Sequence, residues 1–367
     1  MRSVSTRSVP AARSSHARRR HLIVALGLAA LLLIPALPSP VAAQEDVSRV
    51  AIVTPASRTN QGWDQQGVDN LVAVGTQTGV EVEVAENAGY DDITPILLDL
   101  ASDGSQLIVC HASGYQAVCP DFAATEQVPV VVIENPGAVS AGLVSDIETQ
   151  AQEAAYLAGV MAGSETRTGT VAIVVTGQPP TWNYMAVGFA EGLKASRPDA
   201  HLIYTSVGEG TYDDAAGAKQ VTDTVLAANA DIVFGMGDGA AFGMVQSIRE
   251  FNQSRPVEQQ ARFIDVIGDK SNGDAHDLLL TSVLFDYTAA YTQFISDVEA
   301  GTFGSIYTMN VANNGVRLLP PPIAVRPETT AAVDAARTAI VDGRVVVSAI
   351  GDAGGMQARL GALFPRV

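Results

Sequence analysis

Lysine, cysteine, histidine and tryptophan are all scarce in this chain of 367 residues. It holds five histidines, two cysteines, two tryptophans and only three lysines, which are Lys194, Lys219 and Lys270. The 22 basic and 39 acidic residues give a formal net charge of −17. Because residues 1–43 contain six arginines and no acid, the rest of the chain carries −23. A surface this acidic repels phosphate backbones, so we expect no nucleic-acid partner.

The motifs of several enzyme classes are also missing. The sequence has no Gly-x-Ser-x-Gly elbow, no Walker loop and no His-Glu-x-x-His, and its histidines lack metal-ligand spacing. Cys110 and His111 are neighbours, but adjacent residues on a strand point to opposite faces, which argues against a thiol–imidazole pair. We therefore expect a protein that is not an enzyme and needs neither a metal nor a cofactor.

One stretch formally matches a cofactor motif. Residues 235–240, Gly-Met-Gly-Asp-Gly-Ala, fit G-x-G-x-x-A, the pattern of dinucleotide-binding turns. Asp238 would place a negative charge inside the turn that has to hold a pyrophosphate, which argues against this interpretation. We expect instead a glycine-rich turn that presents Asp238 to a cleft, with capping of the following helix as the simpler alternative.

Residues 1–43 have the pattern of a secretory signal peptide. Arginines at 18–20 precede the apolar run 22–37, and small residues at 41 and 43 predict cleavage after Ala43. The alternative is an uncleaved N-terminal anchor, since the run approaches the length of a membrane span. The sequence has no cysteine near the predicted cleavage point that could carry a lipid anchor. We expect an exported protein, periplasmic or extracellular.

The two cysteines, Cys110 and Cys119, are nine positions apart. In an oxidising compartment such a pair is first a candidate disulfide. A metal site is the weaker alternative, because only His111 accompanies them.

Short apolar, β-branched runs alternate with amphipathic stretches along most of the chain. Strands are predicted at 47–53, 80–84, 107–110, 128–133, 170–175, 201–206, 232–234 and 263–267. Helices are predicted at 63–75, 93–103, 149–163, 185–196, 212–228 and 240–251. Continuous apolar strands that alternate with helices indicate a doubly wound α/β architecture with parallel sheets.

This pattern repeats after about 120 residues, which favours two similar lobes over one long sheet. Trp63 and Trp182 then occupy matching places, each in the loop after the first strand of its lobe. Because ligands of open parallel sheets bind beyond the carboxyl ends of the strands, the two rings are expected to face each other across a cleft. Ordinary packing at a loop–helix junction remains the alternative.

The C-terminal part adds pieces that are too few to fold alone. We expect a strand at 281–284, a helix at 286–300, and a short pair at 306–311 and 315–318 turned by Asn313-Asn314-Gly315. A last helix is predicted at 327–341.

Taken together, these stretches resemble the basic membrane protein (BMP) family of substrate-binding proteins, the purine nucleoside receptors of ATP-driven importers. The loop 59–67, Thr-Asn-Gln-Gly-Trp-Asp-Gln-Gln-Gly, is similar to the family's Asn-rich loop, and 153–159 is similar to the helix before its second lobe. Further similar stretches are 266–269, 280–283, 300–303 and 314–318. The resemblance covers most of residues 47–348 and implies a type I periplasmic-binding-protein fold, with two lobes joined by a hinge of several crossings.

In that arrangement residues 47–163 and about 281–303 form an N-terminal lobe, and residues 164–280 and about 304–348 form a C-terminal lobe. The hinge crossings are expected near 163–170, 279–285 and 303–322.

The resemblance further implies an extracytoplasmic, monomeric solute-binding protein that delivers a purine base or nucleoside to an ABC permease. It implies ligand contacts at Asn60, Trp63, Asp238 and Asp269. Trp63 would stack on the base, and Asp269 would contact ribose hydroxyls where a nucleoside is bound. Other candidate contacts are His111, Ser113, Tyr115, Trp182 and Phe285.

Two positions depart from the family pattern. Thr59 stands where nucleoside receptors carry a stacking Phe, and Phe285 where many members carry Lys. Loss of that cation favours a free base or another flat heterocycle.

Three alternatives stay open. The same fold can bind a sugar or an autoinducer-like ligand, since paired aromatic rings also suit pyranose faces. The chain can be a sensory ectodomain that signals to a membrane partner. An exported nucleoside-processing enzyme would need Asp residues clustered around a cation, and the predicted strand ends do not supply them.

Overall fold

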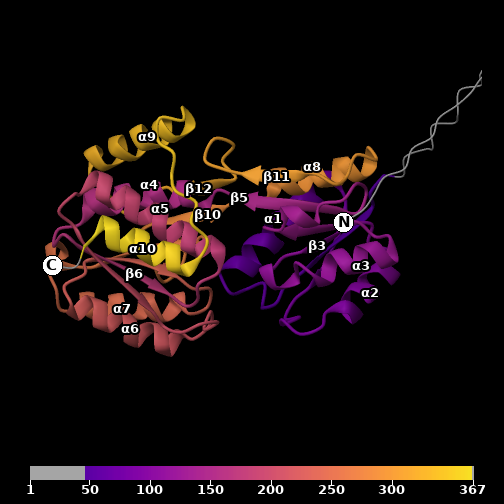
Figure 1. The fold of residues 1–367 in the computed structure, drawn as a ribbon. Helices are drawn as coiled ribbons and strands as arrows, with labels where there is room; N and C mark the ends of the chain where they lie inside the picture. The colour runs from indigo at the N-terminus through magenta and orange to yellow at the C-terminus, as the bar shows by residue number, and fades with distance from the viewer. Residues whose placement is uncertain (1–45, 366–367) are drawn as a thin grey trace, which may run out of the picture. The chain divides into compact units, whose positions relative to one another are not determined.

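The computed structural model describes residues 46–365, so the predicted signal peptide, residues 1–43, lies outside the described residues. Two six-stranded sheets organise the chain (Figure 1). The first sheet is parallel throughout, with the strand order β11-β5-β4-β3-β1-β2. Its strands are β1 Arg49–Val53, β2 Glu81–Ala85, β3 Ile108–Cys110, β4 Val130–Ile133, β5 Val144–Thr149 and β11 Ile306–Met309.

The second sheet repeats this order as β12-β10-β9-β8-β6-β7, and only its edge strand β12 is antiparallel. Its strands are β6 Thr170–Val175, β7 His201–Ser206, β8 Ile232–Met236, β9 Arg262–Ile267, β10 Leu279–Phe285 and β12 Val316–Leu318. The predicted two-lobe, doubly wound architecture is confirmed, because each sheet with its covering helices forms one lobe.

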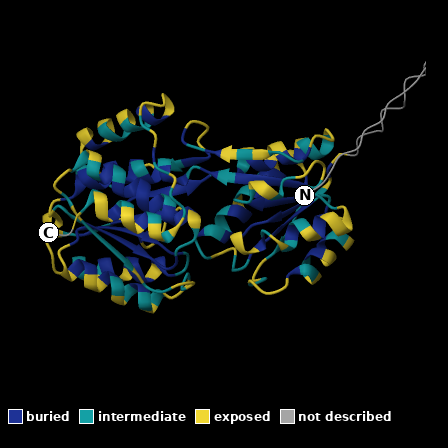
Figure 2. Ribbon diagram, viewed as in Figure 1, coloured by how far each residue is buried: buried dark blue, intermediate teal, exposed yellow. Residues whose placement is uncertain are grey.

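Helices cover both faces of each sheet. In the first lobe α1 (Trp63–Thr78) and α8 (Thr288–Glu299) pack on one face, and α2 (Thr94–Ser102) and α3 (Val118–Glu126) on the other. In the second lobe α4 (Ala151–Glu165), α5 (Pro180–Ser196) and α10 (Ala353–Leu363) lie opposite α6 (Ala215–Ala227) and α7 (Ala241–Asn252) (Figure 1). The central strands are accordingly buried, while the outer helix faces are exposed (Figure 2). No helix within residues 46–365 is both long and apolar enough to cross a bilayer.

Helices α4 and α5 pack unusually closely because glycines face each other along their contact. A side chain at Gly188 would overlap the carbonyl oxygen of Gln152, and one at Gly159 would overlap that of Phe189. The contact places α4 in the second lobe, whereas residues 47–163 were expected in the first. The first crossing therefore lies at Gln150, between β5 and α4, and not near 163–170.

Two further segments belong to the other lobe from the one that the sequence predicted. Strand β10, expected to begin the 281–303 part of the first lobe, pairs with β9 of the second sheet. Strand β11, expected in the second lobe, pairs with β5 of the first. The predicted hairpin of 306–311 with 315–318 is therefore wrong, because β11 and β12 complete the edges of different sheets. The second crossing is at residues 286–287, where Asn70 Oδ1 accepts from the N–H of Tyr287 (2.7 Å). The third crossing is at residues 310–315.

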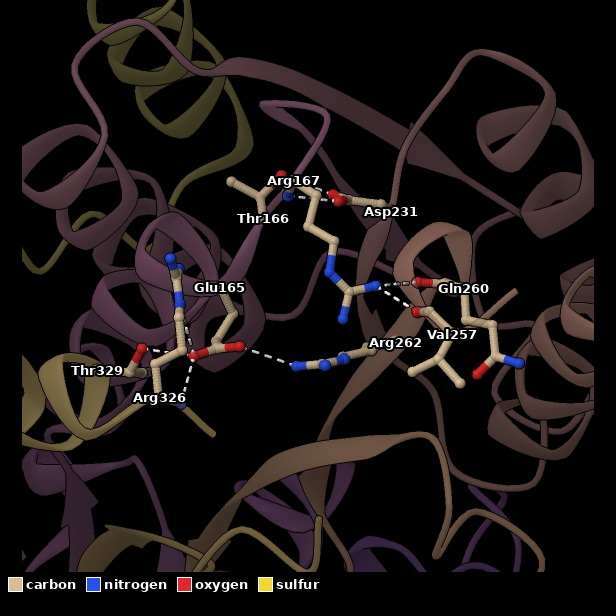
Figure 3. A network of polar contacts seen from close by, with 9 residues as sticks. All are labelled: Glu165, Thr166, Arg167, Asp231, Val257, Gln260, Arg262, Arg326 and Thr329. Atoms are coloured by element: carbon tan, nitrogen blue, oxygen red, sulfur yellow. Dashed lines mark hydrogen bonds and ion pairs between the residues drawn. The ribbon is translucent and has the colours of Figure 1, made fainter. Parts of the chain in front are cut away.

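A polar network holds the C-terminal end of α4 to its neighbours (Figure 3). Glu165 Oε1 accepts from the backbone N–H of Arg326 (3.0 Å) and the hydroxyl of Thr329 (2.5 Å), at the start of α9 (Pro327–Val341). Glu165 Oε2 pairs with Arg262 of β9 at 2.9 Å. This buried carboxylate fixes α9 and the interior strand β9 to α4, although both are far from α4 along the chain.

Cys110 and Cys119 form a disulfide that joins the end of β3 to α3. The bridge anchors the loop 111–118, which contains Ser113 and Tyr115, at the carboxyl end of the first sheet.

Candidate functional site

A narrow cavity of about 70 Å³ lies between the two lobes, at the carboxyl ends of both sheets. We call it the main cavity. Side chains from both lobes line it, so a bound molecule would contact the two lobes at once.

The lining residues come from matching positions of the two repeats. Trp63 and Trp182 follow the first strand of each sheet, and Tyr90 and Tyr212 follow the second. Ser113 and Asp238 follow the third strand, and Glu134 and Ile267 stand at the end of the fourth. Topologically equivalent loops therefore face each other across the main cavity, as expected for ligand sites at the carboxyl ends of parallel strands.

The first lobe holds the Trp63 ring rigidly. Its indole N–H donates to the carbonyl oxygen of His111 (3.0 Å), while His111 Nε2 lies 3.0 Å from the carbonyl oxygen of Trp63. The two rings stack at 4.7 Å, and Phe285 contacts the indole edge-on at 6.0 Å. Burial lowers the pKa of His111 to about 4, so the ring is neutral near pH 7. Trp63 thus offers a preorganised apolar face.

The second lobe provides an aromatic pair on the other side. Trp182, in the first turn of α5, meets Tyr212 edge-to-face with ring centroids 5.3 Å apart. Edge-to-face contact orients both rings and leaves the remaining indole surface for packing against a ligand. Trp182 is only 5% exposed, so it forms a packed part of the cavity wall.

Glu134 is a half-buried acid that lines the main cavity from a strained backbone position. Its φ of 56° is in the left-handed region, which costs energy for a residue other than glycine. Oε1 accepts from the hydroxyl of Thr149, and Oε2 accepts from the hydroxyl of Thr181 in the opposite lobe, each at 2.5 Å. Burial raises the pKa of Glu134, and the two threonine hydroxyls oppose this shift. Ile267 of the second lobe has a similar φ of 70°.

Two further carboxylates line the wall nearest the first helix. Asp64 Oδ1 accepts from the N–H of Ala56 (3.0 Å), and its Oδ2 accepts from the side-chain amide of Asn60 (2.7 Å). Asp238 Oδ1 accepts from the backbone N–H of Trp63 across the lobes (3.0 Å). Burial, with added repulsion from Asp64 and Asp213, raises the pKa of Asp238 to about 7. Both acids accept hydrogen bonds, so they suit N–H or O–H donors of a ligand.

The lobes are held close at this edge by backbone contacts. Lys270, which pairs with the buried Asp265, also donates to the carbonyl oxygen of Gln61 (2.9 Å). A side chain at Gly268 would overlap that same carbonyl oxygen, and one at Gly62 would collide with Asp238. The structure is therefore a closed arrangement in which the two lobes touch beside the cavity.

The structure brings some of the candidate residues together and separates others. Four line the main cavity: Trp63, Ser113, Trp182 and Asp238. Five do not: Asn60, His111, Tyr115, Asp269 and Phe285. Asn60, His111 and Phe285 instead support Asp64 and Trp63, and Tyr115 is buried with its hydroxyl donating to the carbonyl oxygen of Gly89 (2.6 Å). Asp269 is exposed and accepts from the N–H of Ser271 (2.9 Å), because the turn at Ile267 carries the chain away from the cavity.

Sequence reasoning missed Asp64, Tyr90, Glu134, Thr181 and Tyr212. Tyr90 and Tyr212 follow matching strands, so the repeat that pointed to the tryptophans carried a signal for them as well. Glu134 directly follows an apolar run and was open to the same argument as Asp238. Thr181 had no such signal, because its role depends on contact with the other lobe. Within residues 46–365, no group of three or more acidic, histidine or cysteine side chains is arranged to hold a metal ion.

Solved structures resemble this fold along most of the chain. A solute-binding protein of an ABC transporter system from Conexibacter woesei DSM 14684 superposes with a TM-score of 0.70 at 19% identity, covering 83% of this chain and 99% of that one. A corresponding protein from Aeropyrum pernix K1 gives 0.72 at 17% identity, covering 86% and 98%. The arabinose-binding protein AraP from Geobacillus stearothermophilus gives 0.56 at 15% identity, covering 75% and 97%. These similarities confirm the type I periplasmic-binding-protein fold.

Curated relatives match over shorter segments. The ABC transporter nucleoside-binding protein BmpA of Lactococcus lactis is 25% identical over 206 residues, which are 53% of this chain and 57% of the relative. The transcriptional activator protein Med of Bacillus subtilis is 23% identical over 207 residues, 56% of this chain and 63% of the relative. The matched part thus spans little more than half the length of either relative.

The family comparison extends further along the chain than these relatives do. The model described as "Bmp: ABC transporter substrate-binding protein PnrA-like" matches residues 47–350, which include both sheets and every side chain placed around the main cavity. The chain therefore belongs to the Bmp family of PnrA-like ABC transporter substrate-binding proteins.

Proposed function

We propose that this protein captures a purine base or purine nucleoside in the main cavity and delivers it to an ABC permease. The observation that carries the proposal is the pairing of Trp63 and Trp182, on opposite lobes, with acids that accept hydrogen bonds beside them. Flat heterocycles with N–H donors match such a site, because stacking uses their faces and the carboxylates meet their edges. The nucleoside-binding relative in L. lactis agrees with this ligand class.

Closure of the two lobes supplies the mechanism. The hydrogen bonds from Trp63 to Asp238 and from Thr181 to Glu134 both cross between the lobes beside the cavity. A ligand that touches both walls binds the closed state better than the open one and shifts the population toward it. We propose that the crossings at 150, 286–287 and 310–315 act as the hinge and that the closed form docks the permease.

Selectivity follows from the buried acceptors. A ligand that brings no donor to Oδ2 of Asp238 leaves this oxygen unpaired in the closed cavity, which costs affinity. We infer in addition that the protein is exported and acts as a monomer, in line with the signal-like pattern of residues 1–43.

A thermal-shift panel tests this function. Adenine, adenosine, guanosine, uridine, arabinose and glucose are compared at equal concentration, with tryptophan emission recorded in parallel. We expect a purine or a purine nucleoside to raise the melting temperature and change the emission, since a ligand that binds only the folded state stabilises it. Trp63→Ala should abolish the response, whereas Tyr307→Ala, on β11 outside the cavity, should retain it. A response to sugars alone would overturn the purine assignment.

Similarity to the activator Med supports a second candidate, a ligand-sensing role without transport. Both roles need the same cavity, so ligand binding does not separate them. Measuring purine uptake in cells that lack this protein separates the two roles. Loss of uptake supports import, and unchanged uptake with altered gene expression supports sensing.

A further inference from the structure

A second cavity of about 400 Å³ adjoins the main cavity, and we call it the vestibule. The two cavities share four lining residues, which are Asp64, Tyr90, Tyr212 and Asp238. The vestibule adds Asp213 and Asp214, from the loop that precedes α6. A molecule seated between Trp63 and Trp182 therefore has room to extend a substituent past the two tyrosines into a space walled by four aspartates.

These carboxylates have no matching positive charge. Among the described residues that line the two cavities there is no lysine, arginine or histidine. Lys270, whose charge acts on Asp238, is itself buried in an ion pair with Asp265 and donates to Gln61. The vestibule therefore gathers four carboxylates with no cation in its lining, and two of them, Asp213 and Asp214, are exposed and carry their charge near pH 7 only under the screening of solvent.

Several carboxylate oxygens also have spare capacity to accept hydrogen bonds. Within residues 46–365, Oδ2 of Asp213 and Oδ2 of Asp238 take no hydrogen bond, while their Oδ1 atoms accept from Gly239 and Trp63. The two tyrosine rings add faces that attract cations. Burial raises the pKa of Asp238, and repulsion from Asp64 and Asp213 adds to this shift, while Lys270 opposes it.

We propose that, among ligands of the same shape, the vestibule binds cations more tightly than neutral molecules and neutral molecules more tightly than anions. The preferred ligand is then a flat heterocycle whose substituent ends in a protonated amine. This inference rests on the proposed function, since it assumes that a purine ring occupies the main cavity. A protonated amine supplies three donors and a charge to the free aspartate oxygens. A phosphate or carboxylate in the same place meets only acceptors and like charge.

Three adenosine derivatives that differ at one position test the ranking. Adenosine, 5′-amino-5′-deoxyadenosine and adenosine 5′-monophosphate are titrated into the protein by isothermal calorimetry at pH 7. We expect the amine to bind about tenfold more tightly than adenosine, and the monophosphate at least about a hundredfold more weakly, from the interaction of unit charges near a protein surface. In 0.5 M salt the differences should shrink, because exposed charges are screened.

A matched pair of variants locates the effect. Asp213→Asn keeps an oxygen to accept from Gly239 but removes one vestibule charge, so the ratio of amine to adenosine affinity should fall about threefold. Asp277→Asn removes an exposed charge ahead of β10, at the opposite end of the sheet, and should leave the ratio unchanged.

The outcomes separate the two claims. If adenosine binds but the amine is no tighter, or the monophosphate binds equally well, the charge ranking is wrong and the purine function stands. If none of the three binds, and no purine in the thermal-shift panel does either, the proposed function itself fails.

Discussion

Among single residues, Thr181 is the most direct probe of how closure contributes to binding. Its hydroxyl donates to Glu134 of the other lobe, and valine has the same shape without the hydroxyl. A hydrogen bond of this kind contributes about 1 kcal/mol, which is about fivefold in a dissociation constant. We predict that Thr181→Val binds adenosine about fivefold more weakly by calorimetry.

The control for this variant is Thr330→Val on α9, an exposed threonine remote from the cavity, which should bind like the unaltered protein. Equal affinity of Thr181→Val and Thr330→Val would show that the contact between Thr181 and Glu134 plays no part in closure.

Asp238 makes stability depend on pH. Its pKa is raised to about 7 in the folded protein, mainly by burial, whereas an unfolded aspartate titrates near pH 3.9, about its ordinary value. Between these values the folded state holds a proton that the unfolded state has lost, so the free energy of unfolding falls as pH rises from about 4 to 7. We predict a lower melting temperature at pH 8 than at pH 5.5.

Burial also raises the pKa of Asp146 to about 7, so Asp146 makes stability depend on pH in the same direction. The test is therefore a comparison between the unaltered protein and a variant of Asp238. Asp238→Asn keeps an acceptor for the N–H of Trp63 but does not titrate. Its melting temperature should change less between pH 5.5 and 8 than that of the unaltered protein, and equal changes would contradict the assignment to Asp238.

At the scale of elements, the contact between α4 and α5 determines where α5 places Thr181 and Trp182. Gly188→Ala forces a methyl group against the carbonyl oxygen of Gln152, so we predict a loss of about 1–3 kcal/mol in the free energy of unfolding. Gly361→Ala on α10, where a methyl group meets nothing within 4 Å, should keep or slightly raise stability, because alanine favours helix. Urea denaturation measures both, and a similar effect of the two substitutions would contradict close packing.

The sequence predicts elements well where their apolar pattern is local. The eight strands expected from apolar, β-branched runs all form, and all but the edge strands β2 and β7 are mostly buried, as fits the interior of a parallel sheet. Strand β5 was missed because polar Ser145 and Asp146 interrupt it. The hydroxyl of Ser145 is satisfied by the backbone N–H groups of Gly304 and Ser305, more than 150 residues away, and no local pattern reveals such partners.

The same distinction applies to the candidate site. The repeat pointed to two tryptophans that both line the main cavity, because equivalent loops of two similar lobes converge at the carboxyl ends of the strands. It did not predict that Asp269 turns outward, since this depends on the left-handed backbone at Ile267. Nor did it separate the side chains that line the cavity from those behind them, such as His111 under Trp63.

For the whole molecule, the central claim is that one purine bridges two lobes. Hydrogen exchange followed by mass spectrometry tests it most directly, on peptides that cover 60–66 in the first lobe and 178–184 and 236–243 in the second. With saturating adenosine we predict slower exchange in all three peptides, because the ligand favours the closed state in which the N–H of Trp63 is bonded to Asp238. Arabinose should leave them unchanged. Protection confined to one lobe, or protection by arabinose and not by adenosine, would contradict the account.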